Sequence, residues 1–295
     1  MYDVVIVGGS YAGMAAALQL ARARRKVLVV DAGQRRNRFA STSHGLLGRD
    51  GYSPADIATE AREQLLKYST VTWRQGQAVG ASSVDGGFEV ESDSGERVTA
   101  QRLILAMGIS DEMPPVPGLD ERWGRSVFHC PYCHGYELEE GPLGVLAVGE
   151  VSMHQALLLP DWGPTTLFIN GQFEPTAEQR EQLDDREVTV ETEQVSRVSG
   201  DRATVELADG RTIELAGLFV APRIRLNSPL ASQLGCQLAD SPMGEVIETD
   251  GMKQTTVPGV FACGDAARAA GNVTFAIADG SQAALAAHHS LIWQG

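Results

Sequence analysis

The chain has 295 residues, a formal net charge of −14 at pH 7 and a hydrophobic content of 43%. Its length predicts two domains, because single hydrophobic cores rarely grow beyond about 250–300 residues. The acidity argues against nucleic acids and anionic membranes as partners, and no stretch approaches the roughly 18 apolar residues of a membrane span. The first residues read as a buried strand rather than a signal peptide, so we expect a cytoplasmic protein.

The first predicted elements form a β-α-β unit. A buried strand over Val4–Val7 leads into a glycine-rich turn, an Ala/Leu-rich pattern predicts a helix over about residues 12–24, and a second strand over 27–30 ends at Asp31. Such a turn lets a pyrophosphate sit on the helix N-terminus, and an acid at this position can bond a ribose hydroxyl. Ser10 replaces the middle glycine of the motif and is small enough to keep the backbone close. An ordinary α/β protein can also contain such a turn.

Short strand patterns and turns fill the next part of the chain, before a proline-rich linker over 113–118 marks a domain boundary. Near the C-terminus a short strand ends in Cys263-Gly264-Asp265, and a final helix is predicted over about 276–291. The intermediate strand patterns cover 71–74, 87–92, 97–99 and 103–105.

The run Cys130-Pro131-Tyr132-Cys133-His134 follows this linker, and it admits several kinds of chemistry. Two cysteines at this spacing can close a redox-active disulfide, and the run also matches a c-type haem attachment site and part of a zinc site. Haem attachment would need export. Zinc needs four ligands, whereas His129 or His134 adds at most a third, and the remaining cysteines, Cys236 and Cys263, stand alone. A glutaredoxin would carry the pair near the start of a much shorter chain. We therefore favour a dithiol/disulfide pair.

In motif order and over nearly its whole length, the chain resembles the low-molecular-weight thioredoxin reductase family. The resemblance implies an α/β fold with two Rossmann-like three-layer domains. A discontinuous FAD domain over 1–112 and 245–295 would hold an inserted disulfide-bearing domain over 113–244. It implies FAD binding by Gly8, Ser10, Tyr11, Ala12, Gly13, Asp31, Arg36, Arg38, His44, Val79, Ala106, Met107, Gly108, Gly264, Asp265, Asn272 and Val273. Arg36 and Arg38 fit equally well as exposed loop arginines.

By the same resemblance, Cys133 is the flavin-facing sulfur and Cys130 the interchange sulfur that meets the substrate. His134 occupies the place where these reductases usually have an acid/base aspartate, and an imidazole can also relay a proton there. A cap or surface histidine is the structural alternative. The motif that continues to Glu137 is similar to that of dithiol oxidases, which close disulfides in dithiolopyrrolone and epidithiodiketopiperazine natural products, and of reductase-like proteins deficient in the NADPH site.

The second nucleotide motif, expected in the inserted domain, is degraded. Only Gly149 of its glycines is present, Val151 would obstruct the pyrophosphate, and Glu150 would repel it. The next strand is followed by residues 170–174, which contain no Arg or Lys to hold a 2′-phosphate. We therefore expect that NADPH is not used.

Two directions of electron flow and one non-enzymatic role remain open. A substrate dithiol could reduce the disulfide and then the flavin, with oxygen or another acceptor receiving the electrons. Alternatively, a donor such as ferredoxin could reduce the flavin, or the chain could be a flavin or redox sensor without turnover. The substrate could be a small dithiol or a thioredoxin-like protein, and the resemblance implies a homodimer. We expect Cys133 to rest against the flavin, and Trp293 either to cover the flavin or to pack at a dimer interface.

Overall fold

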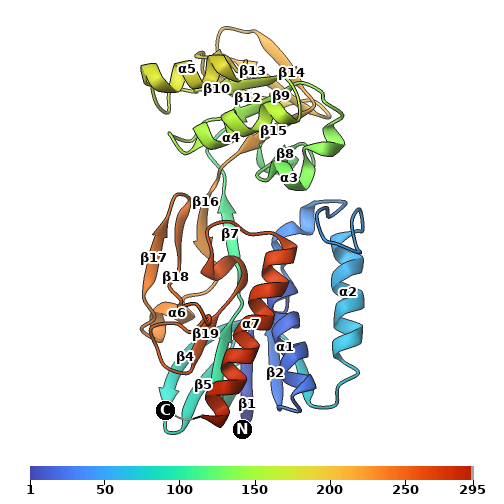
Figure 1. Cartoon of the computed structure of the whole chain (residues 1–295), viewed down its shortest axis with the longest axis vertical. Helices are drawn as coiled ribbons and strands as arrows, with labels where there is room; N and C mark the ends of the chain where they lie inside the picture. The colour runs from blue at the N-terminus through green and yellow to red at the C-terminus, as the bar shows by residue number, and fades with distance from the viewer. Residues whose placement is uncertain (294–295) are drawn as a thin grey trace. The chain divides into compact units, whose positions relative to one another are not determined.

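The computed structural model describes residues 1–293, which fall into two compact units (Figure 1). Unit 1 comprises Met1–Arg38, Pro54–Ser110 and Ile224–Gly295, and unit 2 comprises Phe39–Ser53 and Asp111–Arg223. The expected boundary at 244/245 is therefore corrected to 223/224, and the loop over 39–53 belongs with the inserted unit. Among residues 1–293, no helix combines the length and the apolar character that a membrane crossing requires.

Unit 1 is built on a seven-stranded sheet whose central strands are parallel. Their valines, leucines and isoleucines are almost completely buried, as expected for parallel strands covered on both faces. The order is β3 (Val71–Gln75), β2 (Val27–Asp31), β1 (Tyr2–Val7) and β6 (Arg97–Leu105). Beyond β6 lie the parallel β19 (Val260–Ala262) and the antiparallel β5 (Gly87–Ser92) and β4 (Ala78–Val84).

Four α-helices are described in unit 1, and α1 follows β1 directly through the glycine turn. They are α1 (Tyr11–Arg22), α2 (Pro54–Leu65), α6 (Leu230–Gln233) and α7 (Val273–Ile292). A hairpin of β17 (Leu238–Ser241) and β18 (Gly244–Ile247) completes the unit, and β7 (Ile109–Glu112) pairs with β16 (Arg223–Leu226) where the chain passes between units. Two expectations are corrected: the runs 97–99 and 103–105 form one strand, and the final helix starts at Val273 rather than at 276.

Unit 2 contains a five-stranded parallel sheet and a three-stranded antiparallel sheet that share a core. The parallel order is β11 (Thr189–Glu191), β10 (Thr165–Phe168), β9 (Leu143–Leu146), β15 (Gly217–Val220) and β8 (Val127–Phe128). The antiparallel order is β12 (Val195–Ser199), β13 (Ala203–Leu207) and β14 (Thr212–Leu215), and the helices are α3 (Pro131–His134), α4 (Ser152–Leu158) and α5 (Ala177–Asp185). Two Rossmann-like parallel sheets confirm the predicted α/β class.

Candidate nucleotide and redox sites

The glycine-rich turn of unit 1 can be formed only by residues without a side chain at two positions. Gly8 has φ of +101°, and a Cβ there would lie 2.2 Å from the carbonyl oxygen of Ala106. A Cβ on Gly13 would lie 1.8 Å from the carbonyl oxygen of Gly8. The backbone of β1, the turn and the end of β6 therefore pack directly against one another, and side chains are absent where a phosphate would approach the start of α1.

The start of α1 is held by its own backbone and by Tyr11. Ser10 is the extended N-cap residue, and its carbonyl oxygen accepts from Met14 N at 2.8 Å while its hydroxyl makes no capping bond. The Tyr11 hydroxyl donates to the Pro54 carbonyl oxygen at 3.1 Å and accepts from Asn37 at 3.2 Å, and burial raises the pKa of Tyr11. The tyrosine therefore ties the first turn of α1 to the start of α2.

Two of the predicted cofactor-binding carboxylates make defined contacts. Asp31 accepts from the backbone N–H of Gly9 at 3.0 Å, so the acid at the end of β2 is fixed against the glycine turn. Asp265 pairs with Arg36, whose Nη1 lies 3.0 Å from its Oδ2. The other oxygen of Asp265, Oδ1, would lie 2.0 Å from a Cβ on Gly271, so any side chain at position 271 would clash with this carboxylate.

Near the C-terminus, the chain turns from β19 into α7 through residues predicted to face the flavin. Gly264 has φ of +67°, and a Cβ there would lie 2.9 Å from that of Ala12. Asn272 is the N-cap of α7 and accepts from Phe275 N at 2.8 Å, so Val273 is the first helical residue. The N-terminus of this helix presents a positive partial charge.

The remaining predicted cofactor residues of unit 1 lie on edges and turns of the sheet. The carbonyl oxygen of Val79, on β4, accepts from Gln233 at 3.4 Å, and that of Met107 accepts from Asn227 at 3.1 Å. Gly108 has φ of +65°. The guanidinium of Arg38 donates to the carbonyl oxygen of Arg35 at 2.7 Å. Trp293 is 68% exposed and meets His289 edge-on, so covering of the flavin by Trp293 stays a prediction.

In unit 2, the Cys-x-x-Cys run forms the start of the short helix α3. Cys130 is its extended N-cap residue, Pro131 occupies the first helical position, and the Cys133 N–H donates to the Cys130 carbonyl at 3.2 Å. From α4, the buried Gln155 donates to the carbonyl oxygen of His129 at 2.7 Å and so anchors the chain just before the first cysteine.

His134 is placed behind the cysteines in a largely apolar contact. Its ring stacks on Phe128, with centroids 4.4 Å apart and an interplanar angle of 21°. Burial, with a smaller contribution from nearby His44, lowers the pKa of His134 to about 4. The imidazole is therefore neutral near pH 7. It can exchange hydrogen bonds with a thiol, but it does not retain a proton there.

Within unit 2, His44 lies close enough to His134 to lower the pKa of that residue, and its predicted contact with the flavin stays a prediction. Its Nδ1 lies 3.2 Å from a carboxylate oxygen of Glu137 and 3.6 Å from one of Asp50, while its buried Nε2 has no hydrogen-bond partner among the described residues. A carboxylate at Nδ1 favours the tautomer whose Nε2 can accept a proton. Sequence reasoning missed this role of Glu137, although the residue lies in the quoted motif.

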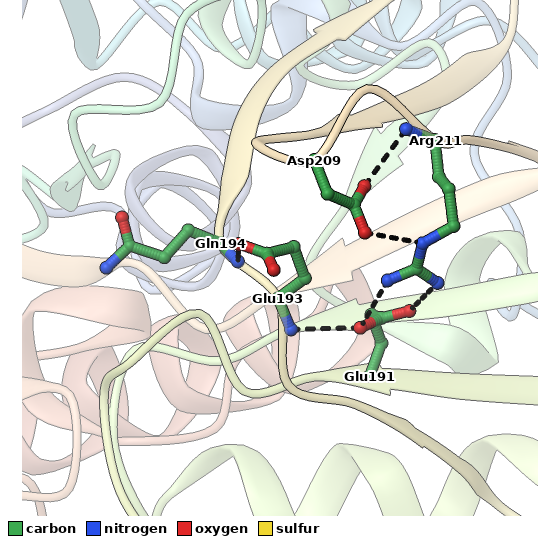
Figure 2. Close-up of polar contacts among 5 residues, drawn as sticks. All are labelled: Glu191, Glu193, Gln194, Asp209 and Arg211. Atoms are coloured by element: carbon green, nitrogen blue, oxygen red, sulfur yellow. Dashed lines mark hydrogen bonds and ion pairs between the residues drawn. The ribbon is translucent and has the colours of Figure 1, made fainter.

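At the carboxyl end of β11 in unit 2, the guanidinium of Arg211 contacts two acidic side chains (Figure 2). Arg211 contacts both oxygens of Glu191, at 2.6 and 3.2 Å, and Asp209 at 2.6 Å. The Glu191 oxygen also accepts from Glu193 N, and Glu193 in turn accepts from Gln194 N. The hydrogen bonds that Arg211 donates lower the pKa of Glu191, and because Glu191 and Asp209 accept them, they raise the pKa of Arg211.

The neighbouring strand ends carry the other features that were expected to exclude a nucleotide. Glu150 is exposed in the turn after β9, and Val151 immediately precedes the seven-residue α4. After β10, the side chain of Asn170 accepts from Val195 N at 2.9 Å. Arg180, on the following helix, forms an ion pair with Glu174. The carboxyl ends of these strands therefore carry several carboxylates, and both Arg180 and Arg211 already form ion pairs with carboxylates.

A split Rossmann-like unit with a glycine turn, followed by a second unit that carries a Cys-x-x-Cys turn, defines a nucleotide-binding disulfide oxidoreductase. Residues 2–282 match the family described as pyridine nucleotide-disulphide oxidoreductase, and the chain belongs to this family, whose members bind FAD. It is an enzyme of the thioredoxin reductase-like class.

Its relatives support this assignment over the whole length. It is 33% identical to a protein named thioredoxin reductase aclD from Aspergillus oryzae, over 97% of this chain and 95% of the other. A crystal structure of an oxidoreductase from Agrobacterium tumefaciens is 55% identical and has a TM-score of 0.96, covering 99% of this chain and 98% of that one. The crystal structure of HlmI is 36% identical, with a TM-score of 0.92 and coverage of 99% and 92%.

Proposed function

We propose that this protein is an FAD-dependent dithiol oxidase that does not take electrons from NADPH. FAD would occupy unit 1, with its pyrophosphate at the glycine turn before α1, where Asp31 ends β2 and Asp265 lies in the 3₁₀ turn that follows β19. The fit rests on the two glycine positions that exclude a Cβ and on the N-terminus of α7 at Asn272.

The observation that carries the exclusion of NADPH is the acidic carboxyl edge of the sheet in unit 2. Dinucleotides bind at the carboxyl ends of parallel strands, where their phosphates need backbone N–H groups or basic side chains. Here Glu150 and Glu191 occupy that edge, Val151 adds bulk after β9, and Arg211 is already held by two carboxylates. Placing a 2′-phosphate there would bring like charges together.

In the proposed reaction, the substrate dithiol loses two electrons and two protons and becomes a disulfide, while the Cys130–Cys133 disulfide becomes two thiols. Cys130 would form the transient mixed disulfide with the substrate, and Cys133 would face the flavin. When bound, FAD supplies a two-electron acceptor that passes the electrons to oxygen. His44, oriented by Glu137, would take the proton from a thiol, and neutral His134 would complete the hydrogen bonding of the pair.

Stopped-flow reduction of the FAD-loaded protein tests this proposal. Dithiothreitol should bleach the visible absorbance of the flavin, and air should restore it, with hydrogen peroxide formed in equal amount to the thiol pairs oxidised. NADPH at micromolar concentration should leave the spectrum unchanged; rapid bleaching by NADPH would overturn the exclusion. A double variant, Cys130→Ser with Cys133→Ser, is the matched control and should retain FAD without bleaching by the dithiol.

The same experiment separates the alternatives. Sustained peroxide production over many turnovers excludes a redox sensor, which would consume one equivalent of thiol and stop. Bleaching by a reduced ferredoxin, followed by reduction of a disulfide substrate, would instead favour the donor-dependent reductase. On the resemblance alone, we also propose a homodimer, to be checked by analytical ultracentrifugation. Contact of Cys133 with the flavin remains a prediction.

A further inference from the structure

Asp279 is a buried carboxylate, on α7, for which the proposed reaction has no use. The residue is 5% exposed although it stands in the middle of a helix, where most acidic residues face water. Its Oδ1 lies 3.0 Å from Nζ of Lys253, and its Oδ2 lies 3.2 Å from Nη1 of Arg268. One buried carboxylate is therefore shared by two partly exposed cations, and the three side chains form an ion triad.

The triad joins three stretches of chain that are distant in the sequence. Lys253 belongs to the loop before β19, and its carbonyl oxygen accepts from Ala262 N, in that strand, at 3.0 Å. Arg268 follows the 3₁₀ turn Gly264–Ala267, and its guanidinium lies over the ring of Phe275, 4.4 Å from the centroid. Asp279 thus links the loop, the segment after the strand and the first half of α7.

The linked segment is the one that carries the predicted flavin contacts Asp265 and Asn272. Next to Asp279, Gly280 packs so closely on α1 that a Cβ would lie 2.0 Å from the Ala12 carbonyl oxygen. Cys263 is fully buried beside the triad, and its pKa is raised to about 12 by burial and by Asp279. The triad therefore lies beside Cys263, the residue that follows β19, and its acid is adjacent to the point at which α7 packs on α1.

A buried ion pair is a poor source of stability, because desolvation offsets most of its attraction, and apolar residues of similar size often serve as well. Such a group does fix geometry, since an ion left without its partner is strongly unfavourable. We propose that Asp279 is a positioning residue for the cofactor site: by holding Lys253 and Arg268 it fixes the segment from Cys263 to Asn272 in the conformation that binds FAD. This inference rests on the proposed FAD site in unit 1.

The test measures the affinity of the apoprotein for FAD, by titration of flavin fluorescence, and not turnover. Asp279→Asn should weaken FAD binding at least tenfold, Asp279→Glu should recover part of the loss, and Arg268→Gln, which removes one contact, should give a smaller loss. Asp240→Asn is the matched control, because Asp240 is an exposed acid on β17 of the same unit. It should bind FAD as the unchanged protein does.

Two outcomes would overturn the inference. The first is a folded Asp279→Asn variant with unchanged FAD affinity. The second is measured on the triple variant Lys253→Met, Asp279→Leu, Arg268→Met. This variant leaves no unpaired ion, so it can be tested even if the single variants fail to fold. Wild-type affinity in the folded triple variant would show that packing alone positions the segment, whereas weakened binding would support the triad. An unchanged protein that fails to bind FAD would refute the proposed function instead.

Discussion

Replacing His134 by phenylalanine should change how the stability of the protein depends on pH. The imidazole stacks on Phe128, and burial together with His44 lowers its pKa from 6.5 to about 4. Phenylalanine retains an aromatic ring for the stack but cannot be protonated. The folded protein resists protonation of His134, so the unfolded chain binds this proton more readily between pH 6.5 and about 4.

The size of the effect follows from the pKa difference. The stability that neutral His134 contributes is fully present above pH 6.5 and is lost as the pH falls toward about 4. One pKa unit corresponds to about 1.4 kcal/mol, so the unchanged protein should lose about 2 kcal/mol more than His134→Phe between pH 7.5 and pH 5. Other groups that titrate in this range are common to both proteins and cancel in the difference.

Urea unfolding at the two pH values, followed by tryptophan fluorescence, measures this difference. His154→Phe is the control, because His154 is an exposed histidine on α4, and its replacement should produce no comparable difference. Equal pH dependence in His134→Phe and the unchanged protein would refute the burial argument. So would an imidazole titration near pH 6.5 for His134 in an NMR spectrum of the folded protein.

Three further outcomes are expected. Gly135→Ala should destabilise the protein by about 2 kcal/mol in urea unfolding, because its Cβ would lie 2.7 Å from both the Trp162 ring and the Pro131 carbonyl oxygen; unchanged stability would contradict this packing. Gly8→Ala should yield protein that is purified with little FAD, measured by the ratio of flavin to protein absorbance. In Cys130→Ser/Cys133→Ser protein, Cys263 should remain unalkylated by iodoacetamide at pH 8 until the chain is unfolded, because the thiol is fully buried and its pKa is about 12; mass spectrometry would detect the modification.

Sequence patterns predicted the elements whose chemistry is local. The β1-α1-β2 unit and its glycine turn could be read because buried parallel strands are continuously apolar and the turn needs glycine at fixed positions. The strand β4 was missed, since Ala78–Val84 is rich in small and polar residues and largely exposed. The late domain boundary was also misplaced, because β16 returns to pair with β7 well before the predicted position. That pairing depends on a partner more than a hundred residues away.

For the site residues as well, the sequence predicted what depends on nearby residues but not the contacts between distant parts of the chain. The motifs predict that Asp31 and Asp265 bind the cofactor, but they could not predict the contacts of Asp31 with Gly9 and of Asp265 with Arg36, which join separate parts of the chain. Glu137 contacts His44, which lies in a loop much earlier in the sequence, so this contact could not be predicted from the motif around Glu137. Motif spacing gives the identity of a reacting group, whereas its proton affinity depends on neighbours that only the fold brings near.

This distinction bears on which histidine acts as the base. By position in the motif, His134 takes the place of the acid/base aspartate, yet its pKa of about 4 makes it a weak proton acceptor for a thiol whose ordinary pKa is near 8.5. His44 has a carboxylate at Nδ1, which orients the ring, and a buried Nε2 without a hydrogen-bond partner among the described residues. Removing the carboxylate with Glu137→Gln should therefore slow flavin reduction by dithiols more than His134→Asn does; the reverse order would assign the base to His134.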